Sequence, residues 1–361
     1  MTETLSHYGK TWPFAFLYLH KGGIIMKKYI IFAVIFVLSF ALCGCAMEDN
    51  DLTSEFQSAP QSQESSQSQQ ESSSEQEAAP KINSSTVLNE DNIAEETEMI
   101  ITGEKSADAP SGFAPLKTVS YSVTKAPDGV QDKKLSHSHG PASGGKAHFT
   151  VEEFQDTFDR YGAVTLDRKS KDKVLYLTFD CGYEYENLTA RILDTLKEKQ
   201  VPATFFCTLD HIEKEKELIA RMIKEGHIVG NHSTTHPSFA EISREKMIKE
   251  IEETENYLRE SFGYVAKYFR FPAGEYTENA LDTVKSMGYM SVFWSVAYDD
   301  WNTDNVRGKD YAVEKVLSRL HPGAIILLHS VSKDNADALG EIIDKAREEG
   351  YSFRALTDYK G

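Results

Sequence analysis

The sequence predicts an α/β fold built on a parallel sheet, and two observations carry that prediction. Short apolar runs recur along the chain, and amphipathic stretches of helical period lie between them. This alternation is typical of βα units, so we expect seven parallel strands in an open sheet or a barrel. The expected strands are 174–179, 203–207, 227–230, 267–271, 290–296, 324–328 and 352–355. The expected helices are 186–199, 214–225, 243–262, 277–287, 310–320 and 335–349.

The first expected strand, V-L-Y-L-T-F at 174–179, is followed directly by Asp180. A short run this rich in Val, Leu, Tyr and Phe is typical of a strand buried on both faces. Asp180 could cap the helix that follows, or it could deliver a carboxylate to a site at the strand end. The longest expected helix is clearer, because Ser243 is a good N-cap and Gly263 ends the apolar stripe.

Residues 26–45 begin with Lys27 and Lys28, continue as an apolar run and end in L-C-G-C. This pattern resembles a bacterial lipoprotein signal, which implies a lipid anchor on Cys45 and an extracytoplasmic protein, expected in a Gram-positive bacterium. The alternative is a plain transmembrane anchor. We expect translation to start at Met26 and residues 1–25 to be a mis-assigned start, because Lys-Gly-Gly-Ile-Ile is what a translated ribosome-binding site would encode.

Composition changes sharply after this segment. Residues 46–112 are dominated by Ser, Gln and Glu, and fifteen acidic residues against two lysines give this stretch −13 of the chain's net charge of −17. With almost no aromatic residues, it is expected to be a disordered tether. The folded remainder is mildly acidic and has no basic stripe, which excludes a nucleic-acid partner. Four cysteines in 361 residues do not make a disulfide framework.

Residues 113–170 are globular in composition, and we expect them to form an extension that packs on the domain at 171–359. A short helix is expected at 151–161. The histidines of this extension lie in a Gly- and Pro-containing stretch, which favours solvated side chains in a polar loop over a metal site. They are His137, His139 and His148.

Polar residues collect at the ends of five expected strands. Because the carboxyl ends of parallel strands lie on one face of such a fold, these residues are expected to form one active site there. Two of them, His232 and His236, have a spacing that on one helical turn would direct both imidazoles at a single metal ion. The full set is Asp180, His232, His236, Arg270, Pro272, Asp299, Asp300, Trp301 and His329.

In order along the chain, these residues resemble the motifs of the polysaccharide deacetylase family, also called the NodB homology domain or carbohydrate esterase family 4. Each motif is weak alone, but the ordered set is highly specific, and the resemblance covers 171–359. The motifs are T-F-D-x-G at 178–182, H-x-x-x-H-P at 232–237, R-x-P-x-G at 270–274, D-W at 300–301 and L-L-H at 327–329.

The resemblance implies a deformed (β/α) barrel that removes acetyl groups from sugar polymers with one divalent metal ion, expected to be Zn²⁺. It implies that Asp180 is the general base and that Arg270 orients it. His329 is implied as the general acid, tuned by Asp300. Residues implied to bind substrate or shape its pocket are Tyr183, Pro272 and Trp301.

The metal ligands that the resemblance implies are His232 and His236. The third ligand of the family is an aspartate at the position where this chain has Cys181. As a thiolate, Cys181 could be a soft ligand that completes a Cys-His-His site. As a neutral thiol, it would be a small packing residue beside a weaker site of two histidines and water.

Further segments resemble the branch of de-N-acetylases that makes muramic δ-lactam from N-acetylmuramic acid lacking its peptide. This implies cell-wall peptidoglycan as the substrate. The alternatives are a deacetylase or esterase for another acetylated polysaccharide, such as chitin or acetylxylan, and an inactive carbohydrate-binding protein of the envelope. The shared segments are G-Y-E at 182–184, F-W-S-V-A…D-W at 293–301, H-P-G-A-I at 321–325 and L-L-H-S-V-S-K-D-N-A at 327–336.

Overall fold

The computed structural model describes residues 110, 112–137, 140–151, 153–170 and 172–359. The expected start at 1–25, the lipoprotein signal at 26–45 and nearly all of the acidic tether at 46–112 lie outside these residues. In the described part of the chain, no helix combines the length and the apolar character needed to cross a bilayer.

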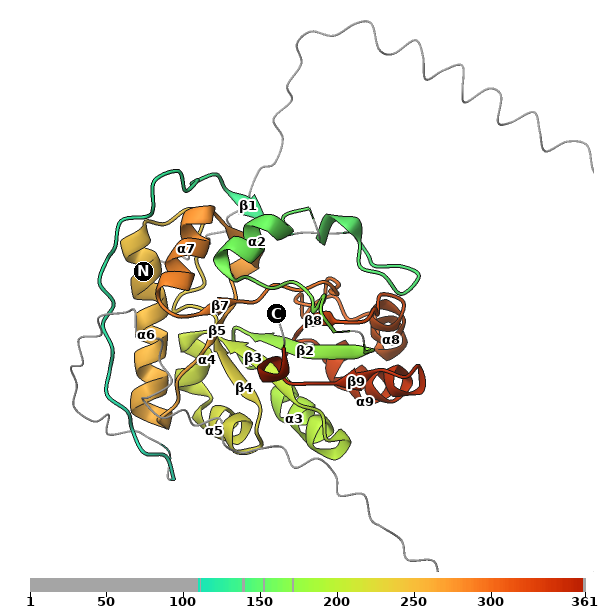
Figure 1. The fold of residues 1–361 in the computed structure, drawn as a ribbon. Coiled ribbons are helices and arrows are strands. Elements are labelled where there is room, and N and C mark those ends of the chain that lie inside the picture. Colours follow the sequence, from blue (N-terminus) through green and yellow to red (C-terminus); the bar gives the residue numbers. More distant parts are fainter. Residues whose placement is uncertain (1–109, 111, 138–139, 152, 171, 360–361) are drawn as a thin grey trace, which may run out of the picture. The chain divides into compact units, whose positions relative to one another are not determined.

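A curled sheet of seven parallel strands forms the centre of the fold (Figure 1), which confirms the sequence prediction. Its strands are β2 (Val174–Cys181), β3 (Ala203–Cys207), β4 (Ile228–Asn231), β5 (Tyr268–Phe269), β7 (Met290–Ser291), β8 (Ala324–His329) and β9 (Ser352–Phe353). They lie in the order β7-β5-β4-β3-β2-β8, and β9 pairs with the start of β2. A bridge between Val296 and Ile326 joins the chain after β7 to β8, so the sheet curls as in a deformed barrel.

Helices cover the outside of this sheet (Figure 1). They are α3 (Leu188–Lys199), α4 (Leu209–Lys214), α5 (Lys216–Lys224), α6 (Arg244–Phe262), α7 (Glu278–Ser286), α8 (Lys309–Leu317) and α9 (Lys333–Glu348). The prediction for α6 is confirmed, because the Ser243 side chain accepts a bond from Lys246 N and Gly263 ends the helix at φ 57°. The prediction missed α4, which directly follows β3 and Thr208.

Alternate residues of β2 point to opposite sides of the sheet. Val174 and Tyr176 belong to an apolar cluster that contains no α-helical residue, so their side is the inner face of the curl. Phe179 and Cys181 belong to the main core, which the helices cover. Extended backbone has a side-chain period of two, so the Asp180 side chain lies on the inner face.

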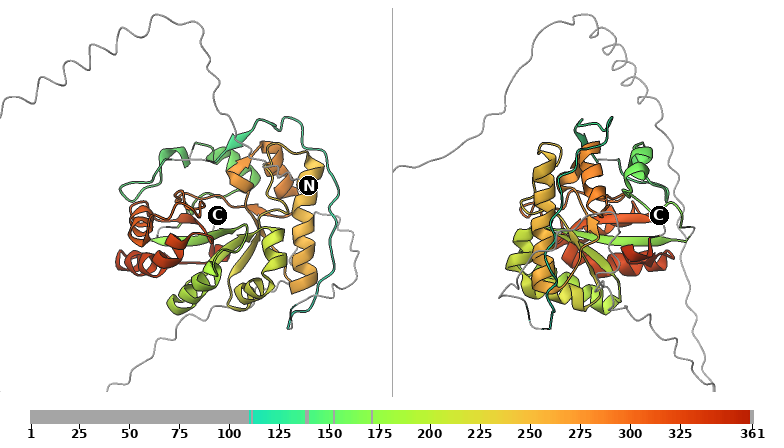
Figure 2. Two further views of the ribbon diagram at one scale, coloured as in Figure 1. Left: turned by 180° about the vertical axis from the view of Figure 1, so that it is seen from behind. Right: turned by 60° about the vertical axis from the view of Figure 1, so that its left-hand side comes forward.

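The segment before β2 packs along the domain. Its strand β1 (Leu135–Ser136) pairs antiparallel with β6 (Glu275–Tyr276), and the stretch before β1 runs beside α6 in both views of Figure 2. Val119 N donates to Asn256 Oδ1 of α6 at 2.7 Å. The expected helix at 151–161 is shorter than predicted: a 3-10 turn covers Phe149–Val151, and α2 covers Gln155–Tyr161.

Candidate active site

A cavity of about 1060 Å³ opens at the carboxyl ends of the strands, on the inner face of the sheet. Seven of the residues that the sequence selects line it, so the cavity brings the ends of β2, β4 and β8 to one place. Four other selected residues, Cys181, Arg270, Pro272 and Asp300, are buried and do not line it. Those that line it are Asp180, Tyr183, His232, His236, Asp299, Trp301 and His329.

The Asp180 carboxylate lies between a guanidinium and an imidazole. Its Oδ1 accepts a hydrogen bond from Arg270 Nη1 at 2.8 Å, and its Oδ2 lies 3.5 Å from His232 Nε2. Burial acts to raise the pKa of Asp180, but the positive charge of Arg270 and its hydrogen bond outweigh it, so the pKa lies below its usual range. Asp180 is therefore ionised at neutral pH, which is the state that a general base requires.

Arg270 is itself held in one position. Its Nε donates to Val292 O at 3.0 Å and its Nη2 to Phe293 O at 3.2 Å. The guanidinium carbon lies 4.1 Å from the centre of the Phe206 ring. Gly230 makes room for that ring, because a Cβ at this position would lie 2.5 Å from a ring carbon. A fully buried arginine with these contacts fixes the direction of the Asp180 carboxylate.

His232 follows β4, and His236 lies in the loop beyond it. The expected helical turn is wrong, because this loop is irregular and both Ser233 and His236 have positive φ, 69° and 56°. The two imidazoles still meet, with ring centroids 4.8 Å apart. His232 Nδ1 lies 2.8 Å from Arg270 O, so Nδ1 donates to that carbonyl and Nε2 carries the lone pair. Burial lowers the pKa of His232 to about 4 and also lowers the pKa of His236.

These side chains fit a divalent cation. Two neutral imidazoles lie side by side, with Asp180 Oδ2 close to one of them, and imidazole nitrogen and carboxylate oxygen are ligands of catalytic Zn²⁺ sites. Within the described residues, no third His, Cys, Asp or Glu joins both histidines in a group whose ligand atoms all lie within 4.8 Å. The donor set that this face offers is therefore His232 and His236, with further positions left for water or substrate.

His329, the last residue of β8, forms a second charged pair across the cavity. Its Nδ1 lies 2.7 Å from Asp300 Oδ1, and its backbone N donates to Asp300 Oδ2 at 2.9 Å. Asn335 Nδ2 donates to the same Oδ2 at 2.5 Å. Burial acts to lower the pKa of His329, but the Asp300 carboxylate outweighs it and raises the pKa above its usual value. The bond at Nδ1 leaves Nε2 as the ring nitrogen that can exchange a proton with substrate.

The aromatic residues Tyr183 and Trp301 lie at the mouth of the cavity and are 48% and 59% exposed. The Trp301 ring centroid lies 6.1 Å from that of His329. Pro272 is different, because it is buried and begins a 3-10 turn (Pro272–Gly274) whose next residue, Ala273, lines the cavity. Pro272 therefore shapes this loop without facing the cavity itself.

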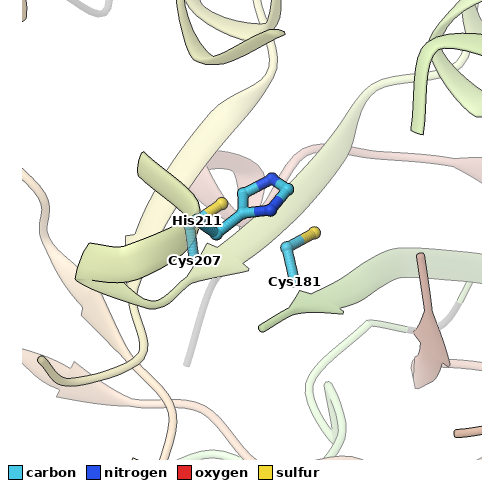
Figure 3. A group of neighbouring side chains, drawn as sticks. All are labelled: Cys181, Cys207 and His211. Carbon is cyan, nitrogen blue, oxygen red and sulfur yellow. The ribbon is translucent and has the colours of Figure 1, made fainter. Parts of the chain in front are cut away.

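Cys181 lies on the other face of β2 from Asp180. Its thiol is fully buried beside Cys207 of β3 and His211 of α4, with all three ligand atoms within 4.8 Å of one another (Figure 3). Burial lowers the pKa of His211 to about 4, so this imidazole is neutral. In this arrangement the Cys181 sulfur is grouped with these two residues and not with the histidines of the cavity.

Two contributors to the site were not found from the sequence. His137, expected in a solvated loop, is 5% exposed and lines the cavity, with its Nε2 2.8 Å from Trp294 O. That expectation was wrong, because the pairing of β1 with β6 places His137 against Phe293, with ring centroids 4.9 Å apart. Asn335 was not singled out either, although it lies six residues after His329 in the segment 327–336.

Comparisons with known proteins agree with this fold and cavity. The family model for polysaccharide deacetylase matches residues 167–292. An uncharacterised 30.6 kDa protein of Geobacillus stearothermophilus is 43% identical over 224 residues, which is 62% of this chain and 82% of that one. The peptidoglycan-N-acetylmuramic acid deacetylase PdaA of Bacillus subtilis is 38% identical over 226 residues, or 62% of this chain and 83% of its own length.

The solved structure of Bacillus subtilis PdaA, a family 4 carbohydrate esterase, matches this fold with a TM-score of 0.61 at 35% identity. The match covers 64% of this chain and 98% of that one. The curled parallel sheet of this chain, with polar side chains at its strand ends, thus has the fold of the family 4 carbohydrate esterases. The chain belongs to the polysaccharide deacetylase family, whose members hydrolyse amide bonds, are typically metal-dependent and include pseudoenzymes.

Proposed function

We propose that this protein is a metal-dependent hydrolase that removes N-acetyl groups from the N-acetylmuramic acid of peptidoglycan. The observation that carries this proposal is the pair of charged contacts around one cavity, Asp180 with Arg270 and His329 with Asp300. One pair keeps a carboxylate ionised and the other favours a protonated imidazole. Binding a sugar requires neither state, whereas amide hydrolysis requires both.

In the proposed reaction, Asp180 takes a proton from the attacking water. Arg270 holds Asp180 Oδ1 and so keeps the other carboxylate oxygen, Oδ2, directed at that water. His329 Nε2 then donates a proton to the leaving amine, because Asp300 holds Nδ1 and stabilises the charged ring. Each positioned acid or base of this kind contributes about 10²–10⁴-fold in rate. For both groups to act on one amide, the acetyl carbonyl has to lie between Asp180 and His329.

His232 and His236 are the residues that would hold the metal ion, and we propose Zn²⁺ because imidazole ligands with open positions suit it. A divalent ion bound there would polarise the carbonyl and lower the pKa of water toward about 7. The bond between His232 Nδ1 and Arg270 O orients this imidazole, so Arg270 supports both the base and a metal ligand.

One feature of the cavity favours a muramic substrate. Muramic acid without its peptide carries a free lactyl carboxylate, and Arg319 is the single Lys or Arg among the described residues that line the cavity. Its Nη1 donates to Ala297 O, which restricts the guanidinium to this side of the cavity. We propose that Arg319 binds the lactyl carboxylate, while Tyr183 and Trp301 contact the sugar faces, as exposed aromatic rings can.

The proposed site of action is outside the cytoplasmic membrane, where peptidoglycan is found. The resemblance of residues 26–45 to a lipoprotein signal supports attachment through a lipid on Cys45. The acidic stretch at 46–112 would then act as a tether between the lipid and the domain.

The test uses the purified full chain with added Zn²⁺. It is incubated separately with intact peptidoglycan, peptide-free muramic glycan, chitin oligomers and acetylxylan, and mass spectrometry measures the loss of acetyl groups. We expect loss from the peptide-free muramic glycan, and none when Asp180→Asn replaces the wild type. Loss from chitin or acetylxylan alone would replace the proposed substrate, and no loss from any of the four would contradict the proposed activity.

A further inference from the structure

Three metal-ligating side chains meet on the helix-covered face of the sheet, away from the cavity (Figure 3). We propose that Cys181, Cys207 and His211 form a second metal site, which binds a soft divalent ion such as Zn²⁺ through two thiolates and one imidazole. This site is separate from the pair of histidines in the cavity and does not depend on the proposed deacetylase activity.

The backbone brings the three residues together. Cys181 and Cys207 are the last residues of β2 and β3, and the register of the two strands places them directly opposite each other. His211 is in the first turn of α4, four residues after Cys207. Thr208 fixes this connection, because its N donates to Cys181 O at 3.1 Å and its Oγ1 accepts from His211 N at 3.3 Å. The cluster is thus built from adjoining rigid elements.

The surroundings of the His211 imidazole indicate that the cluster binds a ligand. Its side chain is fully buried, and neither Nδ1 nor Nε2 has a hydrogen-bond partner. A neutral imidazole has one N–H and one lone pair, and burial of both without partners is unfavourable. A metal ion among the three side chains would accept the lone pair. If two neutral thiols only packed beside His211, the lone pair of its imidazole would stay without a partner.

The charges favour a divalent ion. Loading removes one proton from each thiol, so two protons leave as one M²⁺ enters and the site as a whole is neutral. Neutrality matters because all three side chains are fully buried, where an uncompensated charge is strongly disfavoured. Thiolate ligands also select zinc over hard ions such as Mg²⁺ or Ca²⁺.

The distances are close to those a tetrahedral ion needs. With Zn–S near 2.3 Å and Zn–N near 2.0–2.1 Å, neighbouring ligand atoms should lie roughly 3.5–3.8 Å apart. All three ligand atoms already lie within 4.8 Å of one another, so shifts of about 1 Å in the side chains would suffice. The fourth position of the tetrahedron would take a water or another small donor.

A bound ion here would join the ends of β2 and β3 directly behind the cavity. Asp180 directly precedes Cys181 in β2 and lines the cavity. Thr208 follows Cys207 and also lines the cavity, and its Oγ1 donates to Gly182 O at 3.0 Å. The site would therefore act as a positioning device for the strand end that carries the proposed base, without contacting substrate.

The test uses Co²⁺ as the probe in the full chain. Serines replace Cys43 and Cys45, so that any thiolate signal comes from the two buried cysteines. After reduction and removal of metal, we expect Co²⁺ to produce a thiolate-to-metal charge-transfer absorption that saturates at one ion per chain, and Zn²⁺ to abolish it by displacement. This measurement requires no change in the cluster itself, so it does not depend on whether variants of Cys207 or His211 fold.

Variants then assign the absorption. It should persist in His232→Ala/His236→Ala, disappear in Cys207→Ala, and require more than about tenfold more Co²⁺ in His211→Gln. The matched control is His227→Gln, which removes another buried histidine whose pKa burial also lowers to about 4. His227 Nδ1 accepts from Ala203 N, and this variant should bind Co²⁺ as the parent does.

Three results would overturn the proposal. The first is free, alkylatable thiols with no charge-transfer absorption. The second is a disulfide between Cys181 and Cys207 in the mass spectrum of freshly purified, unreduced chain. The third is loss of the absorption in His232→Ala/His236→Ala, which would make Cys181 a ligand of the ion in the cavity. Acetyl release is measured separately, on the glycan substrates, so this proposal and the proposed function can fail separately.

Discussion

The end of β2 presents two different chemical environments within one residue of each other. On the inner face, Asp180 is paired with Arg270, and the facing His329 is paired with Asp300, around a cavity open to solvent. On the outer face, Cys181 lies in a dry cluster in which the His211 imidazole has no hydrogen-bond partner. Asp180 and His329, which are paired and line the cavity, suit proton transfer, whereas the buried sulfur and nitrogen donors suit a tightly held ion.

The largest effect should come from the inner face. Asp180→Asn keeps the shape of the side chain and its contact with Arg270 but removes the base, so kcat should fall by about 10²–10⁴-fold. The Co²⁺–thiolate absorption should not change, because the outer cluster does not contain Asp180. Asp210→Asn is the control: this residue also lines the cavity, but it pairs with Lys214 at 2.7 Å and should stay within about threefold of the wild type. A similar loss in both variants would contradict the role of Asp180.

Asp300→Asn tests the second pair through the pH profile. The Asp300 carboxylate raises the pKa of His329, and a protonated His329 is active, so the alkaline limb of kcat/KM reports this pKa. Removing the carboxylate lowers the pKa, so the limb should move to lower pH and the maximal rate should fall by up to about 10²-fold. An unmoved alkaline limb would exclude His329 as the group that titrates.

Arg319→Gln tests substrate recognition, with a smaller effect. Losing one charge-assisted hydrogen bond to the lactyl carboxylate should lower kcat/KM on peptide-free muramic glycan by about 10–100-fold. Activity on a substrate without a carboxylate, such as a chitin oligomer, should be the same in the variant as in the wild type. Equal losses on both substrates would show that Arg319 supports the cavity and does not select the sugar.

The smallest effect concerns stability on the outer face. Added Zn²⁺ should raise the melting temperature of His232→Ala/His236→Ala, because an ion at about 100 times its Kd stabilises by about 2.7 kcal/mol, or roughly 5–10 °C. Cys207→Ser in the same background should lose this rise. If both proteins respond equally to Zn²⁺, the stabilising ion binds elsewhere.

Much of the fold could be predicted from the sequence, because short apolar runs and capped amphipathic helices report directly on burial. The errors have local causes. α4 (Leu209–Lys214) is too short to show a helical period. The strand expected at 290–296 is regular only in β7 (Met290–Ser291), because Arg270 binds the carbonyls of Val292 and Phe293 that a longer strand would use in the sheet.

The candidate site was predictable where it follows strand ends and less so where it depends on tertiary contacts. The positions of Asp180, His232 and His329 followed from the motif order. His137 could not be found this way, because the pairing of β1 with β6 that buries it is not local. The face of Cys181 could have been inferred from the strand period of two, but its neighbours Cys207 and His211 required the register of β2 and β3.

Anomalous diffraction at the zinc edge, from crystals of the Zn²⁺-loaded full chain, tests the division between the two faces most directly. We expect two ions for each chain. One should lie between His232 and His236 beside Asp180, and the other among Cys181, Cys207 and His211. A single ion bound by Cys181 together with the two cavity histidines would contradict it.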